Sequence, residues 1–180
     1  MVKEKVTETT QVEVKQVDNP LPMRLWWFYA GALVVLLLDQ ITKVLVRRFL
    51  AEGEVVAVIP NVVHLQHVKN TGAAFGLFAG ATPLLSLIRA GVCVFILLTA
   101  RYWVARGWYL SVVCLLILGG AAGNLVDAVL FGAVTDFIDL DTSFRFIRDW
   151  PVFNVADIAL SVGAVMLVGE LLFQKKVERP

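Results

Sequence analysis

Four long apolar runs constrain this chain of 180 residues more than any other feature of its sequence. They cover residues 25–46, 83–100, 107–126 and 152–173. A helix rises about 1.5 Å per residue, so each run approaches the ~20 residues that cross ~30 Å of hydrocarbon. Hydrophobic residues make up 58% of the chain, whereas a soluble domain has about 45–50%. The sequence therefore predicts an all-α membrane protein with four transmembrane helices.

The basic residues indicate how this bundle is oriented. Four crossings put both ends of the chain on one side. Outside the four runs, that side carries nine lysines and arginines and the other side carries five. Segments rich in Lys and Arg stay in the cytoplasm, so we expect both termini there. The tryptophans fit an interfacial belt, because all of them lie near the ends of runs: Trp26, Trp27, Trp103, Trp108 and Trp150.

The segments outside the helices differ in character. Residues 1–24 are polar and mixed in charge, which predicts a disordered cytoplasmic tail rather than a signal peptide, and 174–180 form a second short tail. Residues 47–82 contain "EVVAVIPNVVHLQHV", which favours a small periplasmic β-sheet between helices 1 and 2. Residues 127–151 read as a shorter loop with most of the acids. The transmembrane domain is thus expected over 25–173.

Carboxylates gather in one layer of this bundle. At about 1.5 Å per residue, Asp39 lies roughly 21 Å from the start of the first run, and Asp127 lies one turn beyond Asn124 near the outer end of the third. Asp157 lies about 7–8 Å below the outer edge of the fourth run, and Asp136 lies in the loop above. An acid facing lipid costs about 2.5–3.5 kcal/mol, so such residues normally face the bundle interior and suggest function.

Two readings of these acids stay open. In the first reading, they have no catalytic role and serve to hold helices together through hydrogen bonds to Asn124, Asn154 and Gln40. Asp136 and Asp157 favour a catalytic reading, because both are flanked by apolar residues, in "VTDFI" and "NVADIAL". Apolar surroundings raise the pKa of a carboxyl, and a second acid nearby separates the two titrations. One protonated and one ionised carboxyl can activate water and polarise a peptide carbonyl near neutral pH.

Other kinds of chemistry have no pattern in the sequence. His64 and His67 lie in the strand region without a further ligand at zinc-like spacing, and no phosphate-binding loop is visible, so we expect no cofactor and no metal. A net charge of +1 argues against nucleic acid as a partner. Cys93 and Cys114 are expected to pack between helices, as are the small residues "GGAAG" at 119–123.

Four blocks of the chain resemble the lipoprotein signal peptidase (signal peptidase II) family of bacterial intramembrane aspartic proteases. They are "DQITK" (39–43), "NTGAAFG" (70–76), "GGAAGNLVDAVLFGAVTDFID" (119–139) and "FNVADIALSVG" (153–163), in the order of the family. The resemblance implies a multi-pass enzyme of the bacterial inner membrane with its active site near the periplasmic face. It would remove the signal peptide of a prolipoprotein, just before the diacylglyceryl-modified cysteine.

The resemblance also implies roles for residues. Asp136 and Asp157 would be the catalytic pair, and Asn124, Asp127 and Asn154 would line the site. Four further positions would organise the site or contact substrate: Asp39, Lys43, Asn70 and Gly72. Membrane lipids and a cyclic peptide inhibitor such as globomycin would be further partners.

One position departs from the pattern of the family. The third block usually reads GNL-x-D-R, and Ala128 stands at the place of the arginine. Its absence keeps open a catalytically altered paralogue that holds precursors or tolerates the inhibitor, and Arg89 or Arg148 could supply the missing charge. A small transporter or proton relay is a further alternative, although its polar groups would be spread through the bilayer.

Overall fold

The computed structural model describes residues 20–72, 80–141 and 150–174. The tails are predicted at 1–24 and 174–180; residues 1–19 and 175–180 lie outside the described ranges, as does most of the glycine-rich segment 72–80. The prediction is wrong at the inner ends of both tails, because residues 21–24 belong to the first helix and residue 174 to the last. Four helices form the bundle: α1 (Leu21–Phe49), α2 (Thr82–Ala105), α3 (Trp108–Phe131) and α5 (Val155–Gln174). Three strands form one sheet: β1 (Val55–Ile59), β2 (Val63–Asn70) and β3 (Val134–Asp139).

The four predicted helices are confirmed, and all four are long and apolar enough to cross a membrane. Three of them extend several residues beyond the apolar runs, and α5 extends by one residue. α1 runs on to Phe49, with Arg47 and Arg48 in its last turn, where cations interact favourably with the helix dipole. α3 runs on to Phe131 and is followed by Gly132, whose φ of 69° is the left-handed conformation that glycine adopts at a helix end. Arg47, Arg48 and Asp127, which lie beyond the apolar runs, therefore belong to helices.

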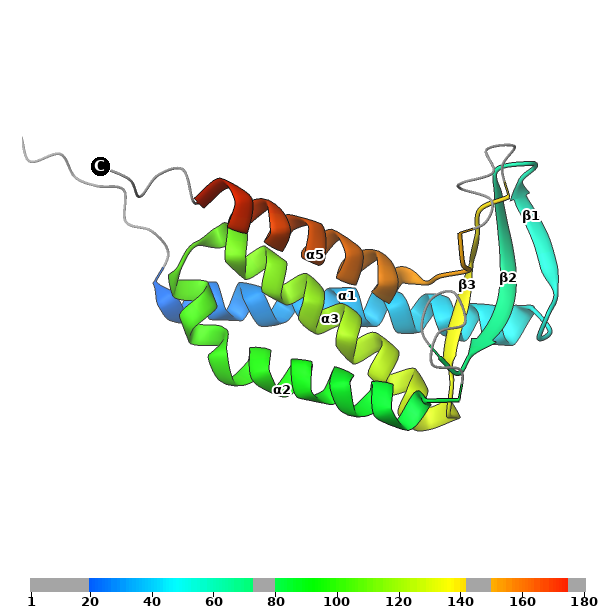
Figure 1. Cartoon of the computed structure of the whole chain (residues 1–180), viewed down its shortest axis with the longest axis horizontal. Helices are drawn as coiled ribbons and strands as arrows, with labels where there is room; N and C mark the ends of the chain where they lie inside the picture. Colours follow the sequence, from blue (N-terminus) through cyan, green and yellow to red (C-terminus); the bar gives the residue numbers. More distant parts are fainter. Residues whose placement is uncertain (1–19, 73–79, 142–149, 175–180) are drawn as a thin grey trace, which may run out of the picture.

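α3 is the centre of the bundle and packs against α1, α2 and α5 (Figure 1). In its most apolar window 56% of residues are buried, against 22% or less in the other helices. The "GGAAG" segment permits this packing. A Cβ on Gly119 would lie 2.8 Å from the carbonyl oxygen of Ala32 in α1, and one on Gly120 would lie 2.6 Å from that of Ala156 in α5. Close helix packing by these small residues is thus confirmed.

The sheet lies across one end of the bundle, opposite the start of α1 and the end of α5 (Figure 1). Its order is β1-β2-β3, and both pairs are antiparallel. β1 and β2 come from the predicted strand region, but β3 comes from 134–139, which the sequence analysis treated as loop. β3 is short and pairs with a strand more than sixty residues away, so local pattern did not reveal it. Its register sets Asn70 opposite Val134 and Val68 opposite Asp136.

β3 also brings the start of α5 to the sheet. The N–H groups of Phe137 and Ile138 donate to the carbonyl of Phe153 at 3.0 and 2.8 Å, and the Phe153 N–H donates to Ile138 at 3.1 Å. This bridge fixes Asn154 and the first turn of α5 beside Asp136.

The close approach at Gly120 can be tested by adding one methyl group. Gly120→Ala should lower stability by about 1–3 kcal/mol, because the backbone of α5 must move away from α3. Gly91→Ala is the matched control, since a Cβ there meets nothing within 4 Å. Thermal unfolding in detergent measures both variants. Equal melting temperatures for the two would contradict this account of the packing.

Candidate active site

Two carboxylates meet where the sheet joins the bundle. Asp136 lies on β3 with only 2% of its surface exposed, and Asp157 lies in the first turn of α5. Both line a cavity of about 560 Å³, together with Asn70, Gly72 and Asn124. The cavity wall is otherwise mainly apolar, with residues of 150–153 and of α5.

Asn154 joins the two carboxylates. Its side-chain N–H donates to Asp136 Oδ1 at 2.6 Å, and its backbone N–H donates to Asp157 Oδ2 at 3.1 Å. In return its Oδ1 accepts the backbone N–H of Asp157 at 2.9 Å. The reciprocal pair is a capping box, in which the residue before the helix and the third helical residue satisfy each other's N–H groups. The sequence "NVAD" therefore starts α5 and places both acids around one asparagine.

Two further asparagines aim their N–H₂ groups at the carboxylates. Lys43 Nζ can only donate, and it donates to Asn124 Oδ1 at 2.8 Å, so the Asn124 amide must turn its Nδ2 to Asp157 Oδ1, also at 2.8 Å. Likewise the Gly72 N–H occupies Asn70 Oδ1, and Asn70 Nδ2 donates to Asp136 Oδ2 at 2.9 Å. All four carboxylate oxygens of the pair thus accept one hydrogen bond.

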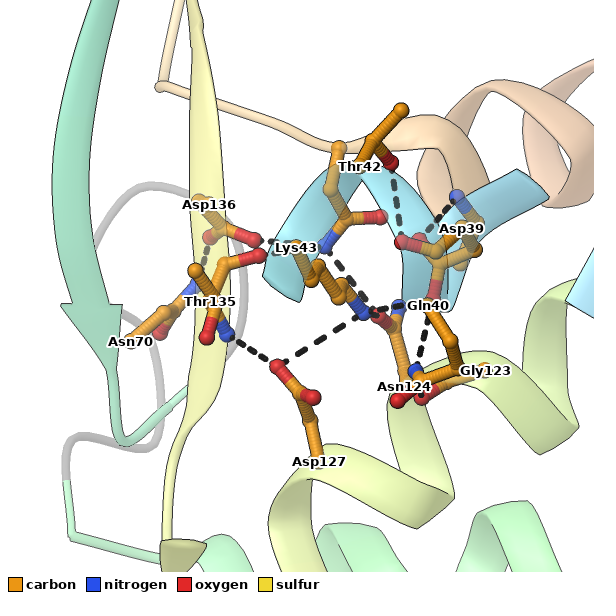
Figure 2. A network of polar contacts seen from close by, with 12 residues as sticks. Asp39, Gln40, Thr42, Lys43, Asn70, Gly123, Asn124, Asp127, Thr135 and Asp136 are labelled. Carbon is orange, nitrogen blue, oxygen red and sulfur yellow. Dashed lines mark hydrogen bonds and ion pairs between the residues drawn. The ribbon is translucent and has the colours of Figure 1, made fainter. Parts of the chain in front are cut away.

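Asp39 and Lys43 lie under this pair and are fully buried. They form an ion pair of 2.9 Å one helical turn apart on α1 (Figure 2). The other Asp39 oxygen accepts the backbone N–H of Ala156 at 2.9 Å, and Gln40 Nε2 donates to Asp39 Oδ2 at 3.1 Å. Asp39 therefore anchors the start of α5 to α1, in agreement with the reading in which this acid holds helices together.

Asp127 ties β3 to α3 and α1. Its Oδ2 accepts the backbone N–H of Thr135 at 2.8 Å, and Arg47 Nη1 lies 2.9 Å from its Oδ1 (Figure 2 shows Asp127 with Thr135). Arg47 also donates to Thr135 Oγ1 at 2.8 Å and lies over the ring of Phe131. Asp127 thus fixes the residue next to Asp136 and does not touch Asp136 itself.

Sequence reasoning did not identify Arg47 and Thr135 as part of this network. A signal existed, because Asp39, Lys43 and Arg47 repeat every four residues and so share one face of a helix. Arg47 was instead counted among the cations of the outer side.

Comparison with known proteins identifies this architecture. The family described as Signal peptidase (SPase) II matches residues 31–173. This chain belongs to the signal peptidase II family. A protein named lipoprotein signal peptidase from Gloeobacter violaceus is 43% identical over 161 residues, covering 86% of this chain and 87% of the relative. One from Halothermothrix orenii is 40% identical and covers 83% of this chain and 97% of the relative.

Solved structures agree with this membership. One, described as a bacterial membrane enzyme obtained by the in meso method, superimposes with a TM-score of 0.78 at 28% identity, covering 86% of this chain and 92% of its own. A second has a TM-score of 0.71 at 29% identity and covers 82% and 94%. The family and the four apolar helices imply a protease that is a multi-pass protein of the inner membrane.

Ala128 is not among the described residues that line the cavity of Asp136 and Asp157. It is buried on α3 and lines a second cavity, together with Thr71, Thr82 and Ser86. Arg89 of α2, in contrast, lines the cavity of the two aspartates. Arg148 lies outside the described residues.

The remaining sequence candidates fit structural roles. His67 is buried in β2 and its Nδ1 lies 3.0 Å from the Leu50 carbonyl oxygen, and His64 lies 3.7 Å from Asp141. In the described part of the chain, no three His, Cys, Asp or Glu residues are grouped to hold a metal. Cys93 and Cys114 are free thiols in the apolar core.

The environment of Asp136 favours its protonated form. Burial is the largest cause and, together with the negative charge of Asp157, raises the pKa of Asp136 from 3.8 to about 7. Hydrogen bonds from Asn70 and Asn154 and the charge of Lys43 act in the opposite direction, because they stabilise the ionised form. Asp136 can therefore hold a proton at a pH where an ordinary aspartate has lost it.

This raised pKa makes stability depend on pH. The folded protein binds a proton at Asp136 more tightly than the unfolded chain does, so protonation favours folding. That stabilisation is complete below about pH 4 and is lost as the pH rises through about 7. Asp136→Asn cannot ionise, so its melting temperature should fall less between pH 4 and 8 than that of the parent. Glu54→Gln, at an exposed position just before β1, is the control and should keep the parent's slope; a parental slope in Asp136→Asn would refute the prediction.

Proposed function

We propose that the chain removes signal peptides from prolipoproteins as an aspartic endopeptidase, cleaving just before the diacylglyceryl-modified cysteine. One observation carries the chemistry: Asn154 joins Asp136 and Asp157 at 2.6 and 3.1 Å, and both carboxylates line one cavity. Membership of the signal peptidase II family and the name of the relatives support the substrate class.

The two carboxylates take different roles in hydrolysis. Asp157 is the base, because it lies at the N-terminus of α5, where the helix dipole stabilises a negative charge, and because Asn124 and Asn154 donate to it. It accepts a proton from water, and that water attacks the scissile carbonyl. Asp136 holds its proton near neutral pH and donates a hydrogen bond to the carbonyl oxygen as negative charge develops there. The proton taken by Asp157 then passes to the leaving amine.

The lining of the cavity suits an extended apolar peptide. Phe153, Ile158, Leu160 and Val162 form one wall, so the signal peptide can bind by apolar contact along α5. The acyl chains of the modified cysteine stay among membrane lipids and hold the scissile bond near the interface. A cyclic peptide inhibitor such as globomycin would occupy the same cavity.

The orientation follows from the charges at the two ends of the bundle. Both termini and the α2–α3 connection would face the cytoplasm, and the sheet and the carboxylates would lie at the periplasmic face. This places the site where the membrane holds a lipid-modified cysteine after export.

Cleavage of a synthetic diacylglyceryl-modified prolipoprotein in detergent tests the catalytic assignment. The parent should release the signal peptide, and Asp136→Asn and Asp157→Asn should each lower kcat by at least a thousandfold, since each removes one of the two acid–base groups. Asp141→Asn is the matched control, because its carboxyl is 46% exposed outside the cavity. It should cleave like the parent.

The outcomes separate the alternatives. Normal turnover by either active-site variant would refute the catalytic pair. A parent that binds the precursor without cleaving it would favour the precursor-holding paralogue suggested by Ala128. Ala128 lies outside the wall of the carboxylate cavity, which supports a competent enzyme.

Labelling of single introduced cysteines tests the orientation. Glu52→Cys lies in the exposed turn before β1, and Arg106→Cys lies at the opposite end, after α2. A membrane-impermeant maleimide added to intact spheroplasts should label position 52, and should label position 106 only after lysis. The parent is the background control, because Cys93 and Cys114 are buried. Labelling of position 106 in intact spheroplasts would reverse the orientation.

A further inference from the structure

The cavity of the two carboxylates contains a cation that the proposed chemistry does not use. Arg89 lies on α2, seven residues after Thr82 and so about 10 Å from the start of that helix. Among the described residues that line the cavity it is the only lysine or arginine. An ionisable residue within a membrane-spanning helix usually has a function, so a binding partner for Arg89 is expected.

Arg89 differs from the two buried or partly buried cations of α1 in having no carboxylate contact among the described residues. Lys43 and Arg47 each lie 2.9 Å from a carboxylate oxygen. Within 20–72, 80–141 and 150–174, Arg89 has no such hydrogen bond or ion pair, although it lies within electrostatic reach of Asp157 and Asp136. Each of the four oxygens of these two acids already accepts an amide or backbone N–H. The guanidinium is therefore held near the reacting groups, and its donors remain available to a molecule in the cavity.

We propose that Arg89 is a substrate-binding residue, whose guanidinium donates hydrogen bonds to a carbonyl oxygen of the lipid-modified precursor. This inference rests on the proposed function and deepens it. The α5 wall of the cavity is apolar, so the part of the substrate that enters is apolar too. The acceptors that such a substrate brings are uncharged carbonyl oxygens, either of its peptide main chain or of the two esters of its diacylglyceryl group.

The positive charge of Arg89 also balances the net charge of the two catalytic carboxylates before substrate binds. Lys43 balances Asp39, and Arg47 balances Asp127. With one proton on Asp136, the pair of catalytic carboxylates retains a single negative charge. Arg89 offsets that charge across the cavity without contact, so a neutral substrate can enter between the cation and the acids and does not have to break an ion pair.

Steady-state cleavage of two precursors tests the proposal and separates the two sources of the carbonyl. One precursor carries the natural diester, and the other carries a dialkyl ether in its place, without ester carbonyls. Arg89→Met should raise KM about ten- to a hundredfold, the loss expected for a charge-assisted hydrogen bond, with a smaller change in kcat. Arg89→Gln, which keeps uncharged donors, should recover part of this loss. If the esters are bound, the rise in KM occurs with the diester alone; if the main chain is bound, it occurs with both precursors.

Arg101→Gln is the matched control, because it removes an exposed arginine from the same helix, and it should leave KM unchanged. An unchanged KM in Arg89→Met for both precursors would overturn the proposal. So would a change confined to the pH profile of kcat, since Arg89 would then act on the carboxylates and not on substrate.

Binding without turnover separates this proposal from the proposed chemistry. In the background of Asp136→Asn, the Kd of the uncleaved diester lipopeptide should rise when Arg89→Met is added. This result is independent of whether the parent cleaves. A Kd that does not change would count against Arg89 alone, whereas absence of cleavage by the parent would count against the enzymatic assignment.

Discussion

A buried lysine organises the polar centre of this protein. Lys43 is fully buried, and its ammonium group lies 2.9 Å from Asp39 and 2.8 Å from the Asn124 oxygen. A charge without a partner inside a membrane bundle is very costly, so α1 and α3 must stay in the one register that satisfies it. The same contact fixes which way the Asn124 amide points, and so determines that Asp157 receives an N–H donor. The contacts of Lys43 therefore fix both the packing of α1 against α3 and the orientation of Asn124 in the site.

The four acids of the outer layer form two groups, which differ in whether a cation contacts the carboxylate. Asp39 and Asp127 are each paired with a cation, and each also accepts a backbone N–H from the element that it anchors. From the described residues, Asp136 and Asp157 receive amide and backbone donors only. A cation in contact favours the ionised form of a carboxylate, whereas neutral amide donors leave the exchange of a proton possible. That no described cation forms an ion pair with Asp136 or Asp157 thus matters as much as their burial.

Sequence alone predicted the parts of this structure that depend on length and period. The four helices follow from apolar runs of about 20 residues, and the common layer of the acids follows from the helical rise. The capping box of "NVAD" lies within four residues and is a local pattern, but the sequence analysis did not predict it. In contrast, β3 forms only because β2 and Phe153 supply partners from elsewhere in the chain. The role of Arg47 in the site was not predicted for a related reason, since its partner Asp127 lies on another helix. Local pattern thus identified the acids, but only the tertiary structure showed which of them are balanced by cations.

The close packing of α3 against α1 and α5 also determines the geometry of the site. Gly119 and Gly120 let α3 approach α1 and α5 so closely that a methyl group would meet backbone oxygens. One turn further, a Cβ on Gly123 would lie 2.5 Å from the Asp39 carboxylate, and Asn124 follows directly. A larger residue at 123 would push Asp39 away from Lys43 and from the start of α5, and would therefore disturb Asn124 and Asp157 together. The polar groups of the site come from α1, α3, α5 and the sheet. They reach hydrogen-bonding distance because α3 approaches α1 and α5 so closely. The small residues of α3 thus contribute to the chemistry by allowing the helices to come close enough for Asp39, Lys43 and Asn124 to form their contacts.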